Sequence, residues 1–371
     1  MITLHAGGVF LVDGKPRDSA PVSPSEGRRR TMAYRILQAH NVSGEASHLR
    51  IRFDALISHD ITYVGIIQQA RASGMLEFPL PYILTNCHNS LCAVGGTINE
   101  DDHLFGLCAA KKYGGVYVPA NLSVIHAYAR EQLADCGSMI LGSDSHTRYG
   151  ALGAMGVGEG GPELARQLLN GTWDVDCPQV VLVYLTGRPR RGVGPHDVAI
   201  ALIKATFGRG FARNRVLEFA GPGLAGLSMD FRSGIDVMTT ETTCLSSIWE
   251  TDETTEAFYR AHLRPEAYRP LHPESGAYYD GLVTVDLSRV EPMIALPFHP
   301  SNAWTIREFL DHAADLLAQV ESDAQARFPA ANVKLLNKLH DNGVWADQGV
   351  VAGCAGGLFH NLTEAADILR G

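Results

Sequence analysis

A short hydrophobic segment that runs into a polar turn and then into a glycine-rich stretch constrains the fold of this chain most. The segment is Ser138–Gly142, and the turn behind it, Asp144-Ser-His146, places a carboxylate, a hydroxyl and an imidazole within three residues. Six of the twelve residues 150–161 are glycine, which lets the backbone approach a bound molecule closely. In open α/β sheets, ligands bind beyond the carboxyl ends of the strands. The sequence therefore predicts an α/β fold with a ligand site at this turn.

Strand-like and helix-like segments alternate along most of the chain. Strands are expected at 82–85, 138–142, 179–186, 216–219 and 349–353. Helices are expected at 58–74, 121–134, 162–171, 195–207, 302–327 and from about 363 onward. Ser58 or Asp60 is expected to cap the first helix, and Gly74 to end it. The alternation favours mainly parallel sheets covered by helices on both faces.

Two stretches do not fit this alternation. Residues 1–45 are polar and contain several prolines, so they are expected to be irregular. Residues 222–260 are rich in Thr, Ser and Gly, and their polar clusters suit the lining of a cleft. In the helix expected at 121–134, the candidate apolar positions are Leu122, Ile125, Tyr128 and Leu133.

Composition and charge exclude several classes of protein. The 371 residues are 46% hydrophobic and 19% charged, as in globular proteins with a sizeable core. A net charge of −9 argues against nucleic acid as the main partner, because phosphate binding needs a basic surface. No apolar run reaches the length of a membrane span, and the first residues lack a signal-peptide pattern. The seven cysteines form no C-x-x-C pair, which predicts reduced thiols and a cytoplasmic protein.

The turn at Asp144-Ser-His146 holds the side chains of a hydrolytic triad, but at the wrong spacing. Triad groups converge from separate elements, and the chain has no G-x-S-x-G elbow. In an extended turn, residues 144 and 146 project the same way, so Asp144 and His146 could face one ligand. A carboxylate and an imidazole together suit the protonation of a hydroxyl leaving group. The alternative is a turn whose Asp and Ser only satisfy local backbone donors.

Other motifs are ambiguous when each is considered alone. Gly156–Gly161 matches G-x-G-x-x-G, but the strand predicted before it ends at about Gly142, so a nucleotide-dependent oxidoreductase is only an alternative. The histidines at 59, 88 and 126 lie near predicted element ends and could be structural or catalytic. Cys354, on an expected strand-to-helix turn followed by glycines, could be a metal ligand or a small buried thiol.

Taken together, these motifs resemble the aconitase superfamily of iron–sulfur hydro-lyases. The most specific match is Gly142-Ser-Asp-Ser-His-Thr147 with the glycines behind it. Further segments resemble the family's motifs in the same order: His59-Asp-Ile-Thr62, Cys87-His88, Val124-Ile-His126, Asp252-Glu-Thr-Thr255, Asp286–Pro300 and Gly353-Cys-Ala-Gly-Gly357. The resemblance covers about residues 45–371 and includes aconitate hydratase and isopropylmalate dehydratase.

The resemblance implies a fold and a division into domains. It implies three-layer α/β/α domains with mainly parallel sheets. The expected boundaries give an irregular segment at 1–45, a first α/β domain at 46–178, a second at 179–298 and the start of a third at 299–371. The C-terminal swivel domain of the family would then be absent from these residues.

The resemblance also implies the reversible dehydration of a small hydroxy di- or tricarboxylate. In the family, three cysteines hold a 4Fe–4S cluster whose free iron acts as a Lewis acid. Position by position, the implied catalytic residues are His88, His126, Asp144 and His146. His59 and Ser145 would contact substrate, and Cys354 would bind the cluster.

Several positions depart from the family pattern. His59 stands where the family has Gln, Cys87 where it has Asp, Arg232 where it has Asn, and Asp236 where it has Glu. Cys354 lacks the following Thr-Asn, and the other two cluster cysteines have no counterpart in the 371 residues. We therefore expect either a hydro-lyase completed by a partner chain or a missing C-terminal half, or a non-catalytic protein that binds anionic metabolites. The isolated chain is expected to be inactive.

Overall fold

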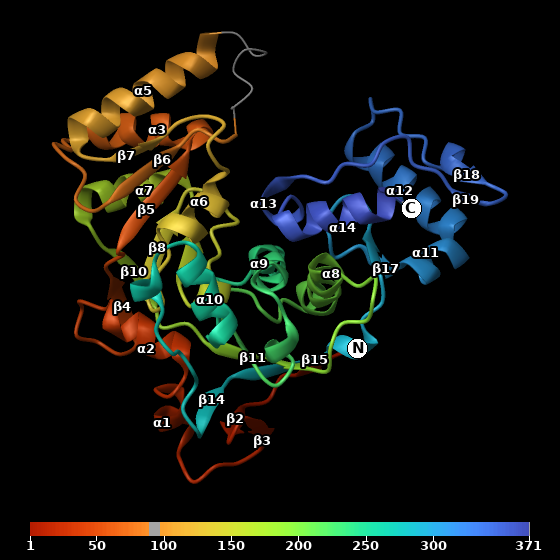
Figure 1. Ribbon diagram of the computed structural model, residues 1–371, viewed down its shortest axis with the longest axis horizontal. Helices are drawn as coiled ribbons and strands as arrows, with labels where there is room; N and C mark the ends of the chain where they lie inside the picture. Colours follow the sequence, from red (N-terminus) through yellow and green to blue (C-terminus); the bar gives the residue numbers. More distant parts are fainter. Residues whose placement is uncertain (89–96, 371) are drawn as a thin grey trace.

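Two five-stranded sheets form the framework of residues 1–88 and 97–370, which the computed structural model describes (Figure 1). In the first sheet all neighbouring strands are parallel. Its order is β7 (Val116–Val118), β6 (Tyr82–Thr85), β5 (Ala55–His59), β8 (Met139–Gly142) and β9 (Met155–Gly158). The hydrophobic segment before the polar turn is thus a strand next to the centre of a parallel sheet, as the sequence predicts.

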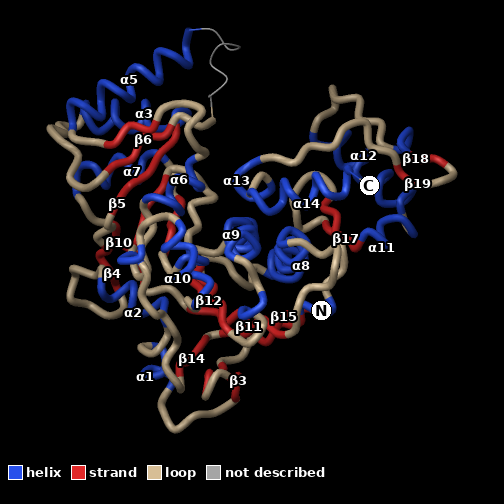
Figure 2. The backbone as a smooth tube through the Cα atoms, viewed as in Figure 1, coloured by secondary structure: helices blue, strands red, loops and turns tan. Residues whose placement is uncertain are grey.

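Helices cover both faces of the first sheet. Side chains alternate between the two faces of a strand. Accordingly, Leu56 of β5 packs in one core with α3 (Asp60–Ala72), α5 (Thr97–Tyr113) and α7 (Gly161–Asn170). Its neighbour Ile57 packs in a second core with α6 (Ile125–Gln132). The arrangement confirms the predicted three-layer α/β/α class, and Figure 2 shows these strands between helices.

The second sheet has a similar construction. Its order is β1 (Ile2–His5), β15 (Gly281–Asp286), β11 (Val180–Thr186), β12 (Val216–Ala220) and β13 (Ser246–Trp249). All pairs are parallel except β1 with β15. One face packs against α8 (Pro195–Thr206), α9 (Met229–Met238) and α10 (Glu253–Ala261). The other face packs against α2 (Met32–Ala39).

The first 45 residues are ordered, so the prediction of an irregular segment is wrong. They contain β1, β2 (Val9–Val12), β3 (Lys15–Arg17), α1 (Pro24–Arg28) and α2. β2 pairs with β3 and with the distant β14 (Ala277–Tyr279), and β1 joins the second sheet. The strands are short, and β1 and β2 find partners, β15 and β14, that lie more than 250 residues away. Local composition therefore does not reveal them. The domain boundaries at 46, 179 and 299 remain a proposal.

The C-terminal segment differs from its prediction in two ways. The helix expected at 302–327 is split into β17 (Ala303–Thr305), α11 (Ile306–Asp311) and α12 (Ala313–Arg327), because β17 pairs with β16 (Met293–Ala295). The strand expected at 349–353 does not form. Val350 and Val351 are 73% and 50% exposed, and a strand needs a neighbour with which to pair its backbone groups. The segment continues through the following elements: β18 (Leu339–His340), β19 (Gly343–Val344), α13 (Gly353–Gly356) and α14 (Phe359–Arg370).

For three helices near the first sheet, the observed ends can be compared with the ends that the sequence predicts. The helix at 162–171 is confirmed as α7, which ends at Gly171 with φ of 70°. The helix expected from Ser58 begins instead at Asp60 after β5, and its N-cap is His59, which makes no side-chain capping hydrogen bond. The helix expected at 121–134 begins only at Ile125, after an extended N-cap at Val124. Asn121 is left-handed, with φ of 64°, and the expected apolar position Leu122 is 63% exposed.

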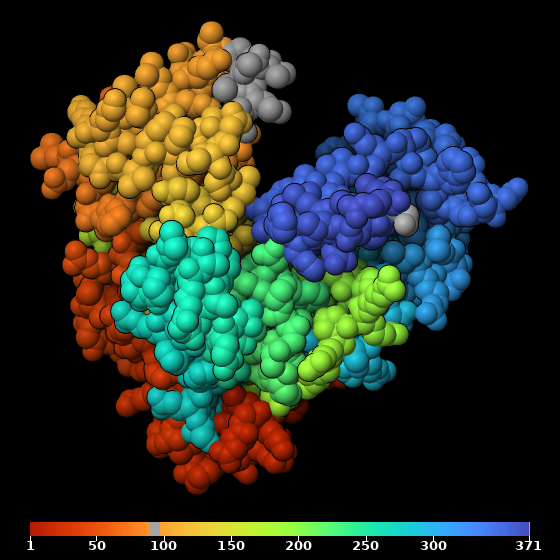
Figure 3. Space-filling model, viewed as in Figure 1, coloured from red at the N-terminus to blue at the C-terminus, as the bar shows by residue number. Residues whose placement is uncertain are grey.

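Short elements complete the architecture. β4 (His48–Ile51) pairs with β10 (Trp173–Asp176) beside the first sheet. The 3-10 turns are η1 (Gly150–Leu152), η2 (Phe207–Arg209), η3 (Leu224–Gly226), η4 (Thr239–Thr242), η5 (Pro265–Ala267), η6 (Leu287–Arg289) and η7 (Leu336–Lys338). Within residues 1–88 and 97–370, no helix is long and apolar enough to cross a bilayer. In the space-filling view a notch separates the part around α5 from the C-terminal segment (Figure 3).

Candidate active site

The turn after β8 is packed against β9 by glycine. A Cβ on Gly158 would lie 2.5 Å from the backbone oxygen of Asp144, and one on Gly142 would lie 2.1 Å from Thr147 Oγ1. Gly156 likewise lies against the backbone of Thr147. The first glycines of the G-x-G-x-x-G match therefore lie within β9 and permit close packing of the turn. This is not the position of a nucleotide-binding loop, which follows its strand.

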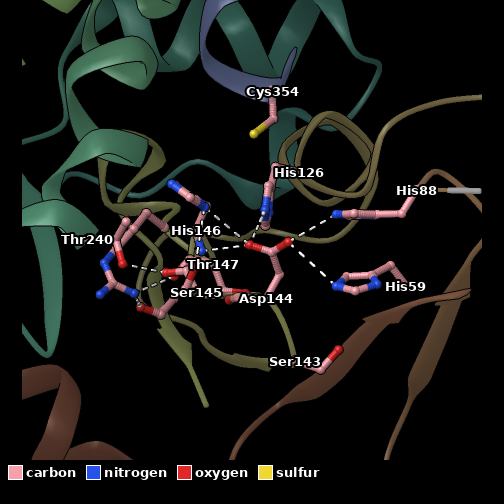
Figure 4. Close-up of polar contacts among 12 residues, drawn as sticks. His59, His88, His126, Ser143, Asp144, Ser145, His146, Thr147, Thr240 and Cys354 are labelled. Atoms are coloured by element: carbon pink, nitrogen blue, oxygen red, sulfur yellow. Dashed lines mark hydrogen bonds and ion pairs between the residues drawn. The ribbon is translucent and has the colours of Figure 1, made fainter. Parts of the chain in front are cut away.

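The imidazoles of His59, His88, His126 and His146, here called the imidazole cluster, surround the Asp144 carboxylate (Figure 4). Oδ2 of Asp144 lies 3.3 Å from His88 Nε2 and 3.6 Å from His59 Nε2. Oδ1 lies 3.2 Å from His126 Nε2 and 3.5 Å from His146 Nδ1. His59 ends β5, His88 follows β6 and His126 lies on α6. All the predicted catalytic residues thus converge on one carboxylate.

Charge is concentrated on part of this cluster. Burial by itself would raise the pKa of Asp144, but hydrogen bonds from His126, His146 and His88 lower it well below its usual range. Hydrogen bonding with Asp144 and with Cys87 raises the pKa of His88 to about 10. Hydrogen bonding with Asp144 and with Glu241 raises the pKa of His146 to about 9. At neutral pH, Asp144 is therefore an anion between two imidazolium cations.

The other two imidazoles are neutral. Burial, together with the charge of His88, lowers the pKa of His59 to about 4. Burial also lowers the pKa of His126, whose Nδ1 lies 3.2 Å from the hydroxyl of Tyr149. His126 Nε2 lies 3.2 Å from Asp144 Oδ1, and His59 Nδ1 is buried without a hydrogen-bond partner. The site therefore combines proton donors with neutral imidazoles around one carboxylate.

Ser145 has a different environment from its neighbours. It is exposed, and its backbone oxygen accepts a hydrogen bond from Thr240 Oγ1 at 2.7 Å. Its Oγ lies 3.4 Å from His146 Nδ1, the same nitrogen that faces Asp144. A hydrolytic triad needs the serine and the carboxylate on opposite ring nitrogens. Hydrolysis through Asp144, Ser145 and His146 does not fit this geometry. The backbone N–H of His146 donates to Asp144 Oδ1 at 2.7 Å, so the carboxylate also stabilises its own turn.

Sequence reasoning missed several groups that complete the site. Glu241 in η4 lies 3.3 Å from His146 Nε2 and 3.6 Å from His299 Nε2. Asp60 accepts a hydrogen bond from the backbone N–H of His88 at 3.0 Å and lies 3.0 Å from His103 Nε2. Glu241 falls in the Thr-rich stretch that the sequence marks as suited to a cleft, which is the one signal for it. Asp60 and His299 lie in the family-like segments His59–Thr62 and Asp286–Pro300, but no local pattern assigned either side chain to the site.

Two positions that depart from the family pattern have structural partners. The Arg232 guanidinium is buried and pairs with Asp252, with Nη1–Oδ1 and Nη2–Oδ2 distances of 2.9 and 2.5 Å. Asp236 is buried, and its Oδ1 accepts hydrogen bonds from Ser247 Oγ at 2.6 Å and Trp249 Nε1 at 2.8 Å. These side chains stabilise the contact of α9 with β13 and α10.

Cys354 faces the site from the C-terminal segment. It lies on α13, which packs against α9 and α6, so the expected strand-to-helix turn is a loop-to-helix turn. Figure 4 shows its thiol directed toward His126 and Asp144, and burial raises the pKa of this thiol. A surface hollow of about 590 Å³ lies beside it, lined by residues that include His146, His196, Met238, Val351 and Asn361.

The described cysteines do not fit a 4Fe–4S cluster by themselves. Such a cluster takes several cysteine thiolates. Cys87 Sγ is engaged by His88 Nδ1 at 3.1 Å. Cys136 and Cys244 are buried, and their thiols donate to backbone oxygens of Leu152 and Thr239 at 3.2 and 3.3 Å. Among residues 1–88 and 97–370, Cys354 is the thiol that the close-up shows facing the imidazole cluster.

The chain resembles known hydratases and dehydratases over most of its length. The model of the aconitase family, described as aconitate hydratase, matches residues 34–371. The 3-isopropylmalate dehydratase large subunit 2 of Rubrobacter xylanophilus is 34% identical over 239 residues, 63% of this chain and 48% of that protein. The mitochondrial aconitate hydratase of Schizosaccharomyces pombe is 28% identical over 304 residues, 75% of this chain and 38% of that protein.

A further relative is covered more fully. The 3-isopropylmalate dehydratase large subunit of Sulfurimonas denitrificans is 27% identical over 327 residues, 87% of this chain and 71% of that protein. The chain thus spans between 38% and 71% of the length of these relatives.

Proposed function

Because the chain belongs to the aconitase family, we propose that it forms the N-terminal part of a hydro-lyase. Its substrate class is a small hydroxy di- or tricarboxylate. The observation that carries the proposal is the ionised Asp144 held between the raised-pKa imidazoles of His88 and His146. An imidazolium positioned by a carboxylate is suited to protonating a leaving hydroxyl group.

The described residues account for one step of a dehydration, the departure of the hydroxyl group, but not for removal of the carbon-bound proton. His88 or His146 donates a proton to the substrate hydroxyl as its C–O bond breaks, and water leaves. Asp144 holds both imidazolium groups in place and stabilises their charge. Ser145, exposed on the same turn, contacts the substrate, and His59 bounds the opposite side. The base that takes the carbon-bound proton belongs, by resemblance, to the swivel domain, as do the arginines that hold the carboxylates.

The cofactor implied by the family is a 4Fe–4S cluster, to which this chain would contribute Cys354. When bound, such a cluster supplies a Lewis-acidic iron for the hydroxyl group. Since the described thiols do not complete its ligand set, we propose that a partner chain or a C-terminal half supplies the remaining cysteines. The 371-residue polypeptide by itself is then inactive.

Reconstitution tests this proposal. The 371-residue chain and its assembly with a C-terminal polypeptide carrying C-x-x-C and a swivel domain are each incubated anaerobically with iron and sulfide. Turnover of aconitate and of isopropylmalate is then measured. We expect turnover only in the assembly, abolished by Asp144→Asn. Turnover by the chain alone would contradict the proposal that a second polypeptide is needed for activity. An assembly that binds iron but turns over no hydroxy acid would contradict the proposal that the protein is a hydro-lyase.

A non-catalytic binder of anionic metabolites is a second candidate. One observation in its favour is that a thiol, Cys87, contacts His88 Nδ1 where the family has an orienting carboxylate. The other is the positive charge of the His88 imidazolium, which attracts anions. This candidate predicts that citrate raises the melting temperature although no turnover appears after reconstitution. A nucleotide-dependent oxidoreductase predicts instead that NAD raises the melting temperature. We expect no such effect, because the glycine motif is occupied in packing β9 against the turn.

A further inference from the structure

A buried carboxylate joins the loop after β6 to α5. The backbone N–H of His88, on that loop, donates to Asp60 Oδ1 at 3.0 Å. The second oxygen, Asp60 Oδ2, lies 3.0 Å from Nε2 of His103 on α5. Asp60 is 1% exposed and His103 is 8% exposed. Because an ionised carboxylate only accepts hydrogen bonds, the His103 Nε2 atom carries a proton and donates to it.

The start of the same loop is held by other buried groups. The Tyr63 hydroxyl donates to Asn86 Oδ1 at 2.6 Å, and Asn86 Nδ2 donates to the Val118 backbone oxygen on β7 at 2.6 Å. A Cβ on Gly106 of α5 would lie 2.6 Å from that hydroxyl, so glycine permits the close approach of α3 and α5. Satisfied buried polar networks of this kind make a structure rigid. The loop is therefore fixed on both sides of Cys87, at Asn86 and at the backbone of His88.

The ring of His88 is contacted on three sides. Its Nε2 lies 3.3 Å from Asp144 Oδ2, its Nδ1 lies 3.1 Å from Cys87 Sγ, and its face stacks on His59 with centroids 3.7 Å apart. Sulfur is a weak hydrogen-bond partner, whereas a carboxylate accepts stronger hydrogen bonds than a neutral group does. The thiol therefore orients the ring less firmly than Asp60 holds the backbone. The place of the ring beside Asp144 thus depends on Asp60.

Asp60 in turn depends on His103. A buried charge needs hydrogen-bonding partners, and Asp60 is the first residue of α3, where the helix dipole also favours an anion. His103 supplies the donor for Oδ2 from α5. Without that donor, the buried carboxylate would turn toward other donors, and its hold on the His88 N–H would weaken.

We propose that His103 is a positioning residue of the site, which fixes the backbone of His88 through Asp60 and so holds His88 Nε2 against Asp144. The inference rests on the proposed function only in giving His88 the role of proton donor. The positioning itself does not require turnover, and His103 donates no proton to the substrate. Helix α5 thus contributes to the site from behind the loop.

NMR of the full 371-residue chain tests this role. His103→Phe keeps a ring of similar size but removes the nitrogen donor. We expect the pKa of His88 to fall from about 10 by about one pH unit or more, because its contact with Asp144 lengthens. The His88 backbone amide should exchange with solvent about tenfold faster or more. The pKa of His146, on a different loop, should stay at about 9. His103→Gln restores a donor to Asp60 and should recover most of both changes.

The matched control is a pair of the same kind at the opposite end of the first sheet. His40 Nε2 lies 2.9 Å from Asp54 Oδ2, and that oxygen accepts a hydrogen bond from the backbone N–H of Met139 at 2.8 Å. Asp54 precedes β5, whereas Asp60 follows it. His40→Phe therefore removes an equivalent donor far from the imidazole cluster. It should leave the pKa and the amide exchange of His88 as in the wild type.

Near-ultraviolet circular dichroism checks that each variant is folded. His103→Ala, which leaves space instead of filling it, gives a second measurement if His103→Phe is poorly folded. An unchanged pKa of His88 in a folded variant, an equal fall at His146, or an equal effect of His40→Phe would each overturn the proposal. A shifted His88 in a chain whose assembly turns over no hydroxy acid would leave the positioning role standing while the hydro-lyase fails.

Discussion

The imidazoles of His59 and His88 stack with their ring centroids 3.7 Å apart and 26° between their planes. They come from the ends of neighbouring parallel strands, and both face Asp144 Oδ2. Their pKa values nevertheless move in opposite directions, to about 4 and about 10. His59 is buried beside a cation, whereas His88 is bonded to the carboxylate and the thiol of Cys87. At neutral pH, His88 therefore carries a proton on both ring nitrogens and His59 is neutral.

Removing the carboxylate should release both imidazolium groups. In Asp144→Asn, we expect the pKa values of His88 and His146 to fall from about 10 and about 9 toward the ordinary value of 6.5. Histidine ring signals followed by NMR across pH 5 to about 10.5 measure both values. Glu241→Gln is the matched change, and it should lower the pKa of His146 but not that of His88, since Glu241 pairs with His146 and not with His88. A His88 that still titrates near 10 in Asp144→Asn would refute this assignment of charge.

A methyl group on the strand behind the turn should destabilise the protein. The Cβ of Gly158→Ala would lie 2.5 Å from the Asp144 backbone oxygen, and overpacking of this kind costs about 1–3 kcal/mol. We expect that loss in the free energy of unfolding, measured with urea, together with shifted signals of His146. Gly160→Ala is the control, because its Cβ would lie 3.7 Å from Pro162, and it should change stability by less than about 0.5 kcal/mol. Equal effects of the two substitutions would contradict the packing argument.

The pair between Arg232 and Asp252 should contribute strongly to stability. Arg232 is fully buried and also donates to the Leu224 oxygen at 3.1 Å. Arg232→Ala leaves the Asp252 carboxylate and that oxygen without their partner, at a cost of roughly 3 kcal/mol or more. Denaturation with guanidinium chloride measures the loss. Arg260→Ala removes an exposed pair with Glu256 and should cost less than about 0.5 kcal/mol. A small effect at Arg232 would mean that water readily replaces the ion pair.

Glu218 should make stability depend on pH. Burial raises the pKa of Glu218 to about 7, although it accepts hydrogen bonds from Ala33 N–H, Tyr279 OH and Met32 N–H. Between its ordinary pKa of 4.5 and about 7, the folded state keeps a proton that the unfolded state has lost. Stability therefore falls as pH rises through this window, by up to about 3 kcal/mol.

Urea unfolding at pH 5, 6, 7 and about 8 measures this dependence. The wild type should lose stability between the first and last of these values. Glu218→Gln carries no titratable proton, so its profile should be flatter over the same window. A variant profile parallel to that of the wild type would assign the pH dependence to other groups.

The sequence predicted the region around β8 well because its signals are local. A short apolar run, a polar turn and glycine spacing are sufficient to place β8, the turn and α7. The family resemblance, rather than local pattern, pointed to His88 and His126. The strands β1, β2 and β17 were not predicted, because they pair with strands that are distant or short. No sequence pattern near them indicates which strand they pair with. The strand expected at 349–353 fails for the opposite reason, because Val350 and Val351 have the composition of a strand without a neighbour to pair with.

By itself the sequence predicted a turn at the end of a strand from which Asp144 and His146 could face one ligand. The tertiary structure decided what they face. Parallel strands bring their carboxyl ends to one edge, so His59 and His88, far from Asp144 in the chain, reach the same carboxylate. Burial and the proximity of charge then divide the imidazoles into neutral and cationic groups. These are properties of neighbours in space, which residue order does not record.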